Sequence, residues 1–401
     1  MISADTVKKL SEKTDSKIVM LVIDGLGGLP DGETGKTELE TARTPNLDRL
    51  AKMGECGLLD PVAPGITPGS APGHLALFGY DPMSCQIGRG ILEALGIDYE
   101  LEPGDVVARG NFCTVNIEGN IIDRRAGRLS TERNVELCRR LDEIVIDGVD
   151  INVRTVKEHR LIVVFRGEGL SAEVTDTDPQ KEGVPPKEAS ALSKEANKTA
   201  KVVNKYLDIV REKLSDVQLV NMILLRGFSQ RPNYASMNEI YKLTPAAIAS
   251  YPMYRGLASV VGMTVLPTGN TFEEEVTTLE QRYGEYDFFF IHAKETDTAG
   301  EDGDFNSKVA AIERIDKAIE RITALKPDVF VVTGDHSTPA LLKKHSWHPL
   351  PLLINSKWCR RDSINTFSEA ACIDGGLGRI AAAQLMTLVM ANALKLAKFG
   401  A

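Results

Sequence analysis

The chain is 401 residues long, 43% hydrophobic and 26% charged, which is typical of a globular protein too large for one ordinary core. Its formal net charge of −9 argues against a general surface for nucleic acid or anionic membranes, but allows a locally basic pocket for a small phosphorylated substrate. The six cysteines form no C-x-x-C pair, residues 1–17 contain no apolar signal-peptide core, and the apolar stretch 380–397 is interrupted by polar residues. We therefore expect a two-domain cytoplasmic protein with neither a nucleic-acid nor a membrane partner.

The N-terminal part of the chain is expected to begin an α/β domain. Residues 17–24 form a continuous apolar run that ends in Asp24, and such a run suits a strand covered on both faces. A helix is predicted over residues 47–53, after a Thr-Pro-Asn start. A loop rich in proline and glycine follows at 61–71, and we expect a second helix over residues 72–78.

Strands and helices are also expected to follow one another near the C-terminus. Residues 286–292 and 328–333 are predicted to be buried strands, the first followed by an acidic loop at 295–304. A helix is predicted between them, because the apolar positions over 309–322 are spaced by three or four residues. The stretch 380–397 predicts a C-terminal helix packed on the core. Alternating strands and helices indicate an α/β fold with a mostly parallel sheet and helices on both faces.

The middle of the chain has a different pattern. Shorter strand-like runs occur at 106–115, 160–165 and 219–225, and a charged helix is predicted over 186–213. We interpret this region as a second, α+β domain inserted into the first. The predicted boundaries are residues 1–95 and 246–401 for the discontinuous core and residues 96–245 for the insertion.

Three predicted strands lead into an acidic residue. Asp24 and Asp335 follow their strands directly, and Asp297 lies five residues after His292. Ligands of open α/β sheets bind at the carboxyl ends of the strands, so we expect these carboxylates to converge there with His336, which is adjacent to Asp335. Each aspartate alone could equally cap a helix or a turn, but together they predict a divalent-metal site.

A serine and a further histidine are candidates for the same site. Ser70 lies at or just before the N-terminus of the helix predicted from residue 72, where free N–H groups and the helix dipole favour a phosphate and a serine alkoxide. Serine is a weak nucleophile unless a base or a metal activates it, and the alternative is that Ser70 is only the N-cap. His345 follows His336 by nine residues, and we expect it to return to the same sheet edge unless it is a surface residue.

Arginines are concentrated in the predicted insertion. An arginine side chain can bind phosphate or carboxylate through two parallel hydrogen bonds, so these residues are candidates for holding a substrate. The alternative is that they are solvated surface residues. The substrate-binding candidates are Asp123, Arg124, Arg125, Arg128, Arg226 and Arg231.

Several segments are each weak evidence of a protein family when taken alone, but together they are specific. They are Val22–Gly25, Lys36–Leu47, Pro64–Pro82, Asp123–Arg128, Asp176–Pro179, Asn221–Gly227, Thr333–Pro339 and Gly375–Arg379. In these segments the chain resembles the archaeal-type cofactor-independent (2,3-bisphosphoglycerate-independent) phosphoglycerate mutases of the alkaline phosphatase superfamily. The likeness runs from about Ile18 to the C-terminal end.

The resemblance implies an alkaline-phosphatase-like core with two metal ions and an inserted domain that binds the substrate. It implies that Ser70 takes the phosphoryl group and returns it to the other hydroxyl of the retained glycerate. The arginines near 125 and at 226 would then hold phosphate and carboxylate. By motif, one metal would be ligated by Asp24, Ser70, Asp335 and His336, and the other by Asp297 and His345.

One position departs from the family's motif for the second metal. The usual Asp-x-x-Gly-His is here Asp297-Thr-Ala-Gly-Glu301, so we take Glu301 as the ligand, with His348 as the alternative and a weak or empty site as the third reading. A carboxylate favours manganese or magnesium over zinc. We expect two divalent ions, manganese first, with magnesium, cobalt or zinc as alternatives. No organic cofactor is expected, because Pro30 stands where a dinucleotide fingerprint needs its third glycine.

The predicted function is interconversion of 2-phosphoglycerate and 3-phosphoglycerate, an isomerase reaction of glycolysis and gluconeogenesis. One alternative is a phosphatase or phosphotransferase for another small phosphorylated metabolite, although a substrate without a carboxylate would not need so many arginines. The other is a binding protein whose second metal site is disabled at Glu301. The sequence makes no prediction of the oligomeric state.

Overall fold

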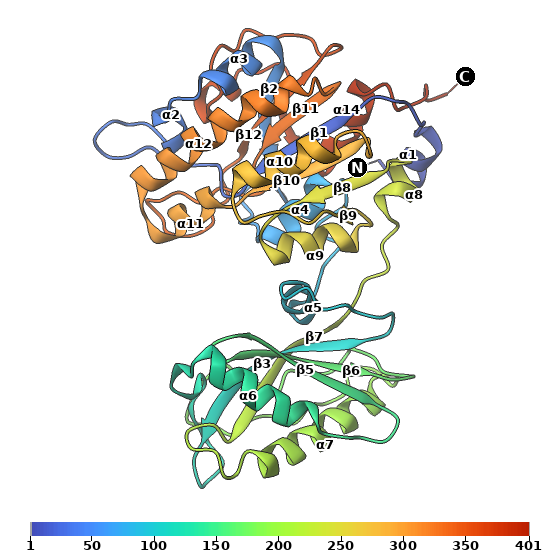
Figure 1. Cartoon of the computed structure of the whole chain (residues 1–401), viewed down its shortest axis with the longest axis vertical. Helices are drawn as coiled ribbons and strands as arrows, with labels where there is room; N and C mark the ends of the chain where they lie inside the picture. The colour runs from blue at the N-terminus through green and yellow to red at the C-terminus, as the bar shows by residue number, and fades with distance from the viewer. Residues whose placement is uncertain (1, 401) are drawn as a thin grey trace. The chain divides into compact units, whose positions relative to one another are not determined.

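The structure, a computed structural model, describes residues 2–400 and contains two compact units (Figure 1). The first unit is formed by the residues up to 86 together with those from 234 onward. The second unit, residues 87–233, is therefore an insertion in the first. No helix within residues 2–400 is both long and apolar enough to cross a membrane.

The first unit is built on an eight-stranded, mostly parallel sheet. In the order in which they pair, its strands are β13 (Gly378–Ala381), β2 (Glu55–Asp60), β12 (Leu350–Ser356), β11 (Val329–Thr333), β1 (Ile18–Ile23), β10 (Phe288–Ala293), β8 (Pro245–Ile248) and β9 (Thr264–Val265). β1 runs parallel to both of its neighbours, β10 and β11. β12 is antiparallel to β11 and β2, so the predicted mostly parallel sheet is confirmed with one reversed strand.

Helices cover this sheet and bury its central strands. They are α1 (Ala4–Leu10), α2 (Glu38–Thr41), α3 (Pro45–Met53), α4 (Ser70–Leu77), α8 (Met237–Tyr241), α9 (Pro252–Val260), α10 (Phe272–Arg282), α11 (Glu295–Asp302), α12 (Phe305–Ala324), α13 (Glu369–Cys372) and α14 (Leu385–Asn392). α12 packs against α2, α3 and α10, whereas α4 packs against α9 (Figure 1). Every residue of β1 and of β10 is buried, which explains why their sequences are apolar runs without alternation.

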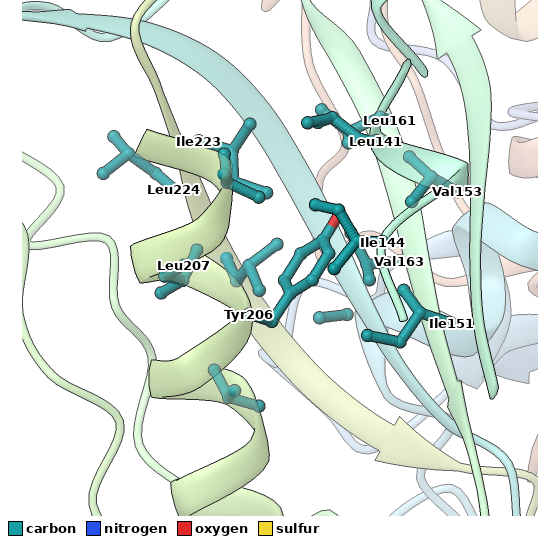
Figure 2. Close-up of a cluster of buried hydrophobic side chains, with 14 of the residues drawn as sticks. Leu141, Ile144, Ile151, Val153, Leu161, Val163, Tyr206, Leu207, Ile223 and Leu224 are labelled. Carbon is teal, nitrogen blue, oxygen red and sulfur yellow. The ribbon is translucent and has the colours of Figure 1, made fainter. Parts of the chain in front are cut away.

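The inserted unit is an antiparallel sheet with helices packed on it. Its strands are β3 (Val106–Val115), β4 (Ile121–Asp123), β5 (Asp150–Lys157), β6 (Arg160–Arg166) and β7 (Met222–Gln230), and its helices are α5 (Arg89–Leu95), α6 (Thr131–Asp142) and α7 (Asn197–Lys213). β3 pairs with β4, β6 and β7, and β6 also pairs with β5. Tyr206 of α7 points into the core toward Ile144 and Val163 (Figure 2) and packs edge-on against Phe165, with ring centroids 5.6 Å apart. The core of this unit is thus its own, as an α+β domain requires.

The acidic segment 295–304 was expected to be a loop, but most of it forms α11. Its acidic first turn, with Glu295 and Asp297, complements the positive end of the helix dipole. Gly303 then ends the helix in the left-handed region, at φ 76°. The acidic first turn and the terminal glycine are local signals for a helix, but the high density of charged residues led us to predict a loop.

Two predicted helices are shorter than expected. Residues 186–196 are not helical, because their backbone pairs with residues 173–177 instead, for example through the Leu192 N–H and the Glu173 carbonyl, 2.7 Å apart. In the C-terminal stretch, residues 380–381 belong to β13 and pair with β2, so the helix there is limited to α14. In both cases backbone pairing with a distant segment overrides helical periodicity.

Candidate active site

The carboxyl ends of three neighbouring strands bring acidic side chains to one place. Asp24 follows β1, Asp335 lies two residues after β11, and Asp297 lies in the first turn of α11 after β10. Because β11, β1 and β10 are adjacent and parallel, these ends lie at the same edge of the sheet. Asp24, Asp335 and His336 are completely buried, and their ligand-type atoms lie within 4.8 Å of one another. We call these three residues the first cluster.

The first cluster fits a bound cation. His336 Nε2 lies 3.2 Å from Asp24 Oδ1 and 3.2 Å from Asp335 Oδ2, but without the geometry of a hydrogen bond. Neither carboxylate oxygen has a hydrogen-bond partner among the residues that the structure describes, and both are buried. Leaving such oxygens unpaired costs free energy, which a cation would offset. Carboxylate and imidazole ligands together suit a first-row divalent metal.

Ser70 faces the first cluster from the N-terminus of α4. It is the first residue of this helix, with Gly69 as the N-cap, and its Oγ lies 3.3 Å from His336 Nε2. The helix reaches this position because it approaches the loop after β11 at Gly73, where a Cβ would stand 2.3 Å from the Asp335 carbonyl oxygen. Free N–H groups in the first turn favour negative charge beside them.

The second cluster shares His336 with the first. It consists of Asp297, His336 and His345, whose ligand-type atoms also lie within 4.8 Å of one another. The His345 ring stacks on that of His336, with ring centroids 3.6 Å apart, and its Nδ1 donates to the Pro68 carbonyl oxygen at 3.0 Å. Since a carbonyl only accepts, Nδ1 carries a proton, and Nε2 is the atom left for Asp297 Oδ1, 3.7 Å away.

Glu301 and His348, the two candidates to replace the histidine of the family's second-metal motif, lie in different places. Glu301, in the last turn of α11, has a side chain that is 57% exposed, with Oε1 3.8 Å from His345 Nε2. The exposed side chain has room to rotate toward His345. His348 shares a hydrogen bond of 3.0 Å with the Ser346 hydroxyl and stacks on Trp347, and within residues 2–400 it belongs to neither cluster.

Two side chains that the sequence pattern did not indicate, Lys294 and Tyr254, also contact Asp24. Lys294 Nζ lies 3.0 Å from Asp24 Oδ2 and also contacts Asp297, so one ammonium group bridges the two clusters. The Tyr254 hydroxyl donates to the same Asp24 oxygen at 2.5 Å, and its ring stacks on His292 with centroids 3.7 Å apart. A signal for Lys294 existed, because it precedes Asp297 by three residues and therefore lies on the same side of a helical turn.

The buried charges of the site shift one another's pKa. Burial raises the pKa of Asp24, but the imidazole rings of His292 and His336 beside it outweigh this effect and hold that pKa well below its usual range. Burial lowers the pKa of His336, whereas Asp335, Asp24 and Asp297 raise it, with a net value of about 9. Without a metal ion at neutral pH, His336 is therefore a cation that partly neutralises the surrounding carboxylates.

The inserted unit carries a separate group of arginines. Arg109 of β3 and Arg226 of β7 lie opposite each other in the sheet register, and Glu93 of α5 lies 3.1 Å from Arg109 Nε. Burial lowers the pKa of Arg109, and the positive charges of Arg226, Arg160 and Arg89 lower it further against the effect of Glu93. Arg226 Nε is buried and lacks a hydrogen-bond partner in the described part of the chain. Such a group suits an anion.

The predicted substrate-binding residues have different environments. Asp123 accepts hydrogen bonds from the N–H groups of Arg125 and of the following turn, so its carboxylate shapes the loop. Arg124 forms a two-pronged ion pair with Asp178, at 2.7 and 3.2 Å. Arg226 belongs to the arginine group of β3 and β7. The side chains of Arg125, Arg128 and Arg231 are exposed.

Comparison with known proteins gives the family. The family model described as 2,3-bisphosphoglycerate-independent phosphoglycerate mutase matches residues 51–220. A protein of Thermus thermophilus, named as a probable mutase of this kind, is 52% identical over 400 residues, which are 98% of each chain. A protein of Thermotoga neapolitana with the same name is 53% identical over 398 residues, again 98% of each chain.

The chain belongs to the 2,3-bisphosphoglycerate-independent phosphoglycerate mutase family. Solved structures agree with this. A cofactor-independent phosphoglycerate mutase from Thermoplasma acidophilum is 30% identical, with a TM-score of 0.79 over 94% of this chain and 100% of that one. A protein from Pyrococcus horikoshii is 28% identical, with a TM-score of 0.81 over 98% of this chain and 100% of that one. The resemblance inferred from the sequence is thus confirmed.

Proposed function

We propose that this chain interconverts 2-phosphoglycerate and 3-phosphoglycerate through a phosphoserine at Ser70, without 2,3-bisphosphoglycerate. The observation that carries the proposal is the position of Ser70, whose Oγ lies at a helix N-terminus, 3.3 Å from His336 Nε2. The same His336 nitrogen lies 3.2 Å from one oxygen each of Asp24 and Asp335, and these two buried oxygens have no hydrogen-bond partner in the described residues. Family membership supplies the substrate class. The arrangement provides a nucleophile, charge stabilisation and a place for divalent ions at one edge of the sheet.

Two divalent ions fit the residues that are present. When bound, such ions neutralise phosphate charge and lower the pKa of a serine hydroxyl. Manganese is the expected ion, because most of the candidate donors are carboxylate oxygens, which favour manganese or magnesium over zinc. The first ion would be held by Asp24, Ser70, Asp335 and His336, and the second by Asp297, His345 and Glu301.

The chemistry consists of two phosphoryl transfers. In the first, Ser70 Oγ forms a bond to phosphorus while the bond from phosphorus to the glycerate oxygen breaks; the serine loses a proton and the released glycerate hydroxyl gains one. In the second, the other glycerate hydroxyl attacks the phosphoserine, and Ser70 regains its proton. The N–H groups of the first turn of α4 stabilise negative charge on the serine oxygen. No net oxidation or hydrolysis occurs.

The glycerate must remain bound between the two transfers, and the inserted unit is the proposed holder. Arg109 and Arg226 lie opposite each other in the strand register, and guanidinium groups suit a carboxylate or a phosphate. A phosphate monoester without a carboxylate would use fewer of these contacts. This preference for an acid substrate separates a mutase from a phosphatase of general specificity.

The test is a coupled assay of purified protein with added manganese, on either phosphoglycerate, beside Ser70→Ala. Turnover in the wild type and none in the variant is expected. Release of inorganic phosphate without isomerisation would assign the chain to the phosphatases instead. A folded, metal-loaded protein that binds phosphoglycerate without turning it over would point to a binding protein.

A further inference from the structure

Thr338 lies between the two clusters and is completely buried. Its hydroxyl oxygen is 2.7 Å from Asp297 Oδ1 and 2.9 Å from His336 Nδ1. A carboxylate oxygen only accepts hydrogen bonds, so the single hydroxyl proton of Thr338 is donated to Asp297. The oxygen has no second proton to give to His336 and must accept one from Nδ1–H. The directions of both hydrogen bonds are therefore fixed.

This chain of hydrogen bonds determines which nitrogen of His336 is left for a ligand. With the proton on Nδ1, a neutral His336 has its lone pair on Nε2, the atom that lies 3.2 Å from both Asp24 and Asp335. Nδ1, which is the nitrogen nearer Asp297, is already in use. His336 is thus assigned to the first cluster alone, and Asp297 and His345 remain for the second.

Thr338 is closely packed by its neighbours. A Cβ at Gly25 would stand 2.7 Å from Thr338 Oγ1, and one at Gly300 would stand 2.2 Å from its carbonyl oxygen. Lys308, also completely buried, donates from Nζ to the carbonyl oxygens of Thr338 at 2.9 Å and of Gly27 at 3.0 Å. Two glycines make room for the threonine and one lysine binds its backbone carbonyl, so the backbone of Thr338 is held close to Asp297 and His336.

We propose that Thr338 is a positioning residue for both metal ions: its hydroxyl orders His336 Nε2 toward the first cluster and holds Asp297 for the second. The inference rests on the proposed two-metal function of this site. Hydrogen bonds to the outer side of a ligand fix its orientation, and their loss weakens metal binding. A single hydroxyl then couples the occupancy of the two sites.

The test compares Thr338→Val, which keeps the shape but removes the hydroxyl, with Thr338→Ser, which keeps the hydroxyl. By calorimetry on chelator-treated protein, Thr338→Val is expected to bind Mn²⁺ about 10–100-fold more weakly, and Thr338→Ser to recover most of the loss. Thr199→Val is the matched control, because Thr199 is equally buried and hydrogen-bonded but lies in the inserted unit. Manganese affinity of Thr338→Val equal to that of wild type would overturn the inference.

A measurement on the wild type keeps the inference testable if Thr338→Val does not fold. Nitrogen NMR of the Zn²⁺-loaded protein with labelled histidine, in which the His336 signal is the one lost in His336→Asn, reports the protonated ring nitrogen. A proton on Nδ1 and metal on Nε2 is expected, and the opposite arrangement would overturn the inference. If the wild type binds neither Mn²⁺ nor Zn²⁺, the proposed function itself fails, and this inference with it.

Discussion

Arg109 and Arg226 lie directly opposite each other on β3 and β7, where two like charges destabilise a sheet. Arg226 Nε is also buried and unpaired within the described residues 2–400. An anion bound by the two guanidinium groups would offset this cost. Without this pair of charges, we therefore expect the inserted unit to be more stable and the protein to bind its substrate more weakly.

Replacing Arg226 tests this directly. Arg226→Met removes one of the two facing charges, so the melting temperature should stay the same or rise, whereas KM for phosphoglycerate should rise about 10–100-fold through loss of a charged hydrogen bond. Arg124→Gln is the contrasting variant, because Arg124 is paired with the buried Asp178 and should lose about 3 kcal/mol of stability. A fall in stability with unchanged KM for Arg226→Met would contradict the assignment.

Gly73 should be essential to the position of Ser70. In Gly73→Ala the added Cβ meets the Asp335 carbonyl oxygen, which must move α4 away from the loop after β11. We expect a loss of about 1–3 kcal/mol in the free energy of unfolding and a larger loss in kcat than in substrate affinity. Gly32→Ala is the control, since nothing described in the structure lies within 4 Å of a Cβ there. Normal kcat in Gly73→Ala would show that Ser70 need not be held so closely.

Glu301→His should strengthen the second metal site. The variant restores an imidazole beside His345, so we expect tighter binding of the second ion and a shift in preference toward zinc. Glu301→Gln, which removes the negative charge but keeps the size, should bind the second ion more weakly than wild type. Metal analysis after dialysis against limiting manganese or zinc measures both effects. Equal metal content in all three proteins would mean that Glu301 is not a ligand.

Glu275 makes stability depend on pH. Burial raises the pKa of this carboxyl to about 8, and its Oε1 accepts a hydrogen bond from the Ser250 N–H. Between the ordinary pKa of a glutamate and pH 8 the folded state binds more protons than the unfolded state, so stability falls as pH rises through this range.

Glu275→Gln keeps the acceptor and cannot ionise. Denaturant unfolding from pH 5 to 9 should therefore show the variant gaining on the order of 4 kcal/mol relative to wild type as pH increases. The same metal content in both proteins is the required control. Parallel pH profiles for the two proteins would mean that Glu275 is already ionised in the folded state.

The sheet and the acids at its edge were predictable, because they depend on local patterns. Apolar runs mark β1, β10 and β11. A residue that follows a buried parallel strand lies at the carboxyl edge of the sheet, and this holds whatever the order of the strands in the sheet. The position of Ser70 at a helix start was predictable in the same way, from the proline- and glycine-rich loop before it.

Other parts of the site depend on contacts that no local pattern contains. Tyr254 reaches Asp24 from α9, and its sequence surroundings resemble those of any core tyrosine. The role of Thr338 follows only from the distances of one hydroxyl to Asp297 and His336. Arg109 stands in an apolar strand, and only the strand register places it opposite Arg226.

The central claim is that Ser70 carries the phosphoryl group during the reaction. The most direct measurement is acid quenching of the manganese-loaded protein during turnover of 3-phosphoglycerate, followed by phosphopeptide mass spectrometry. The account predicts phosphate on Ser70 in the wild type and none in Ser70→Ala. Continued isomerisation with no phosphate on Ser70, or undiminished turnover by Ser70→Ala, would contradict it.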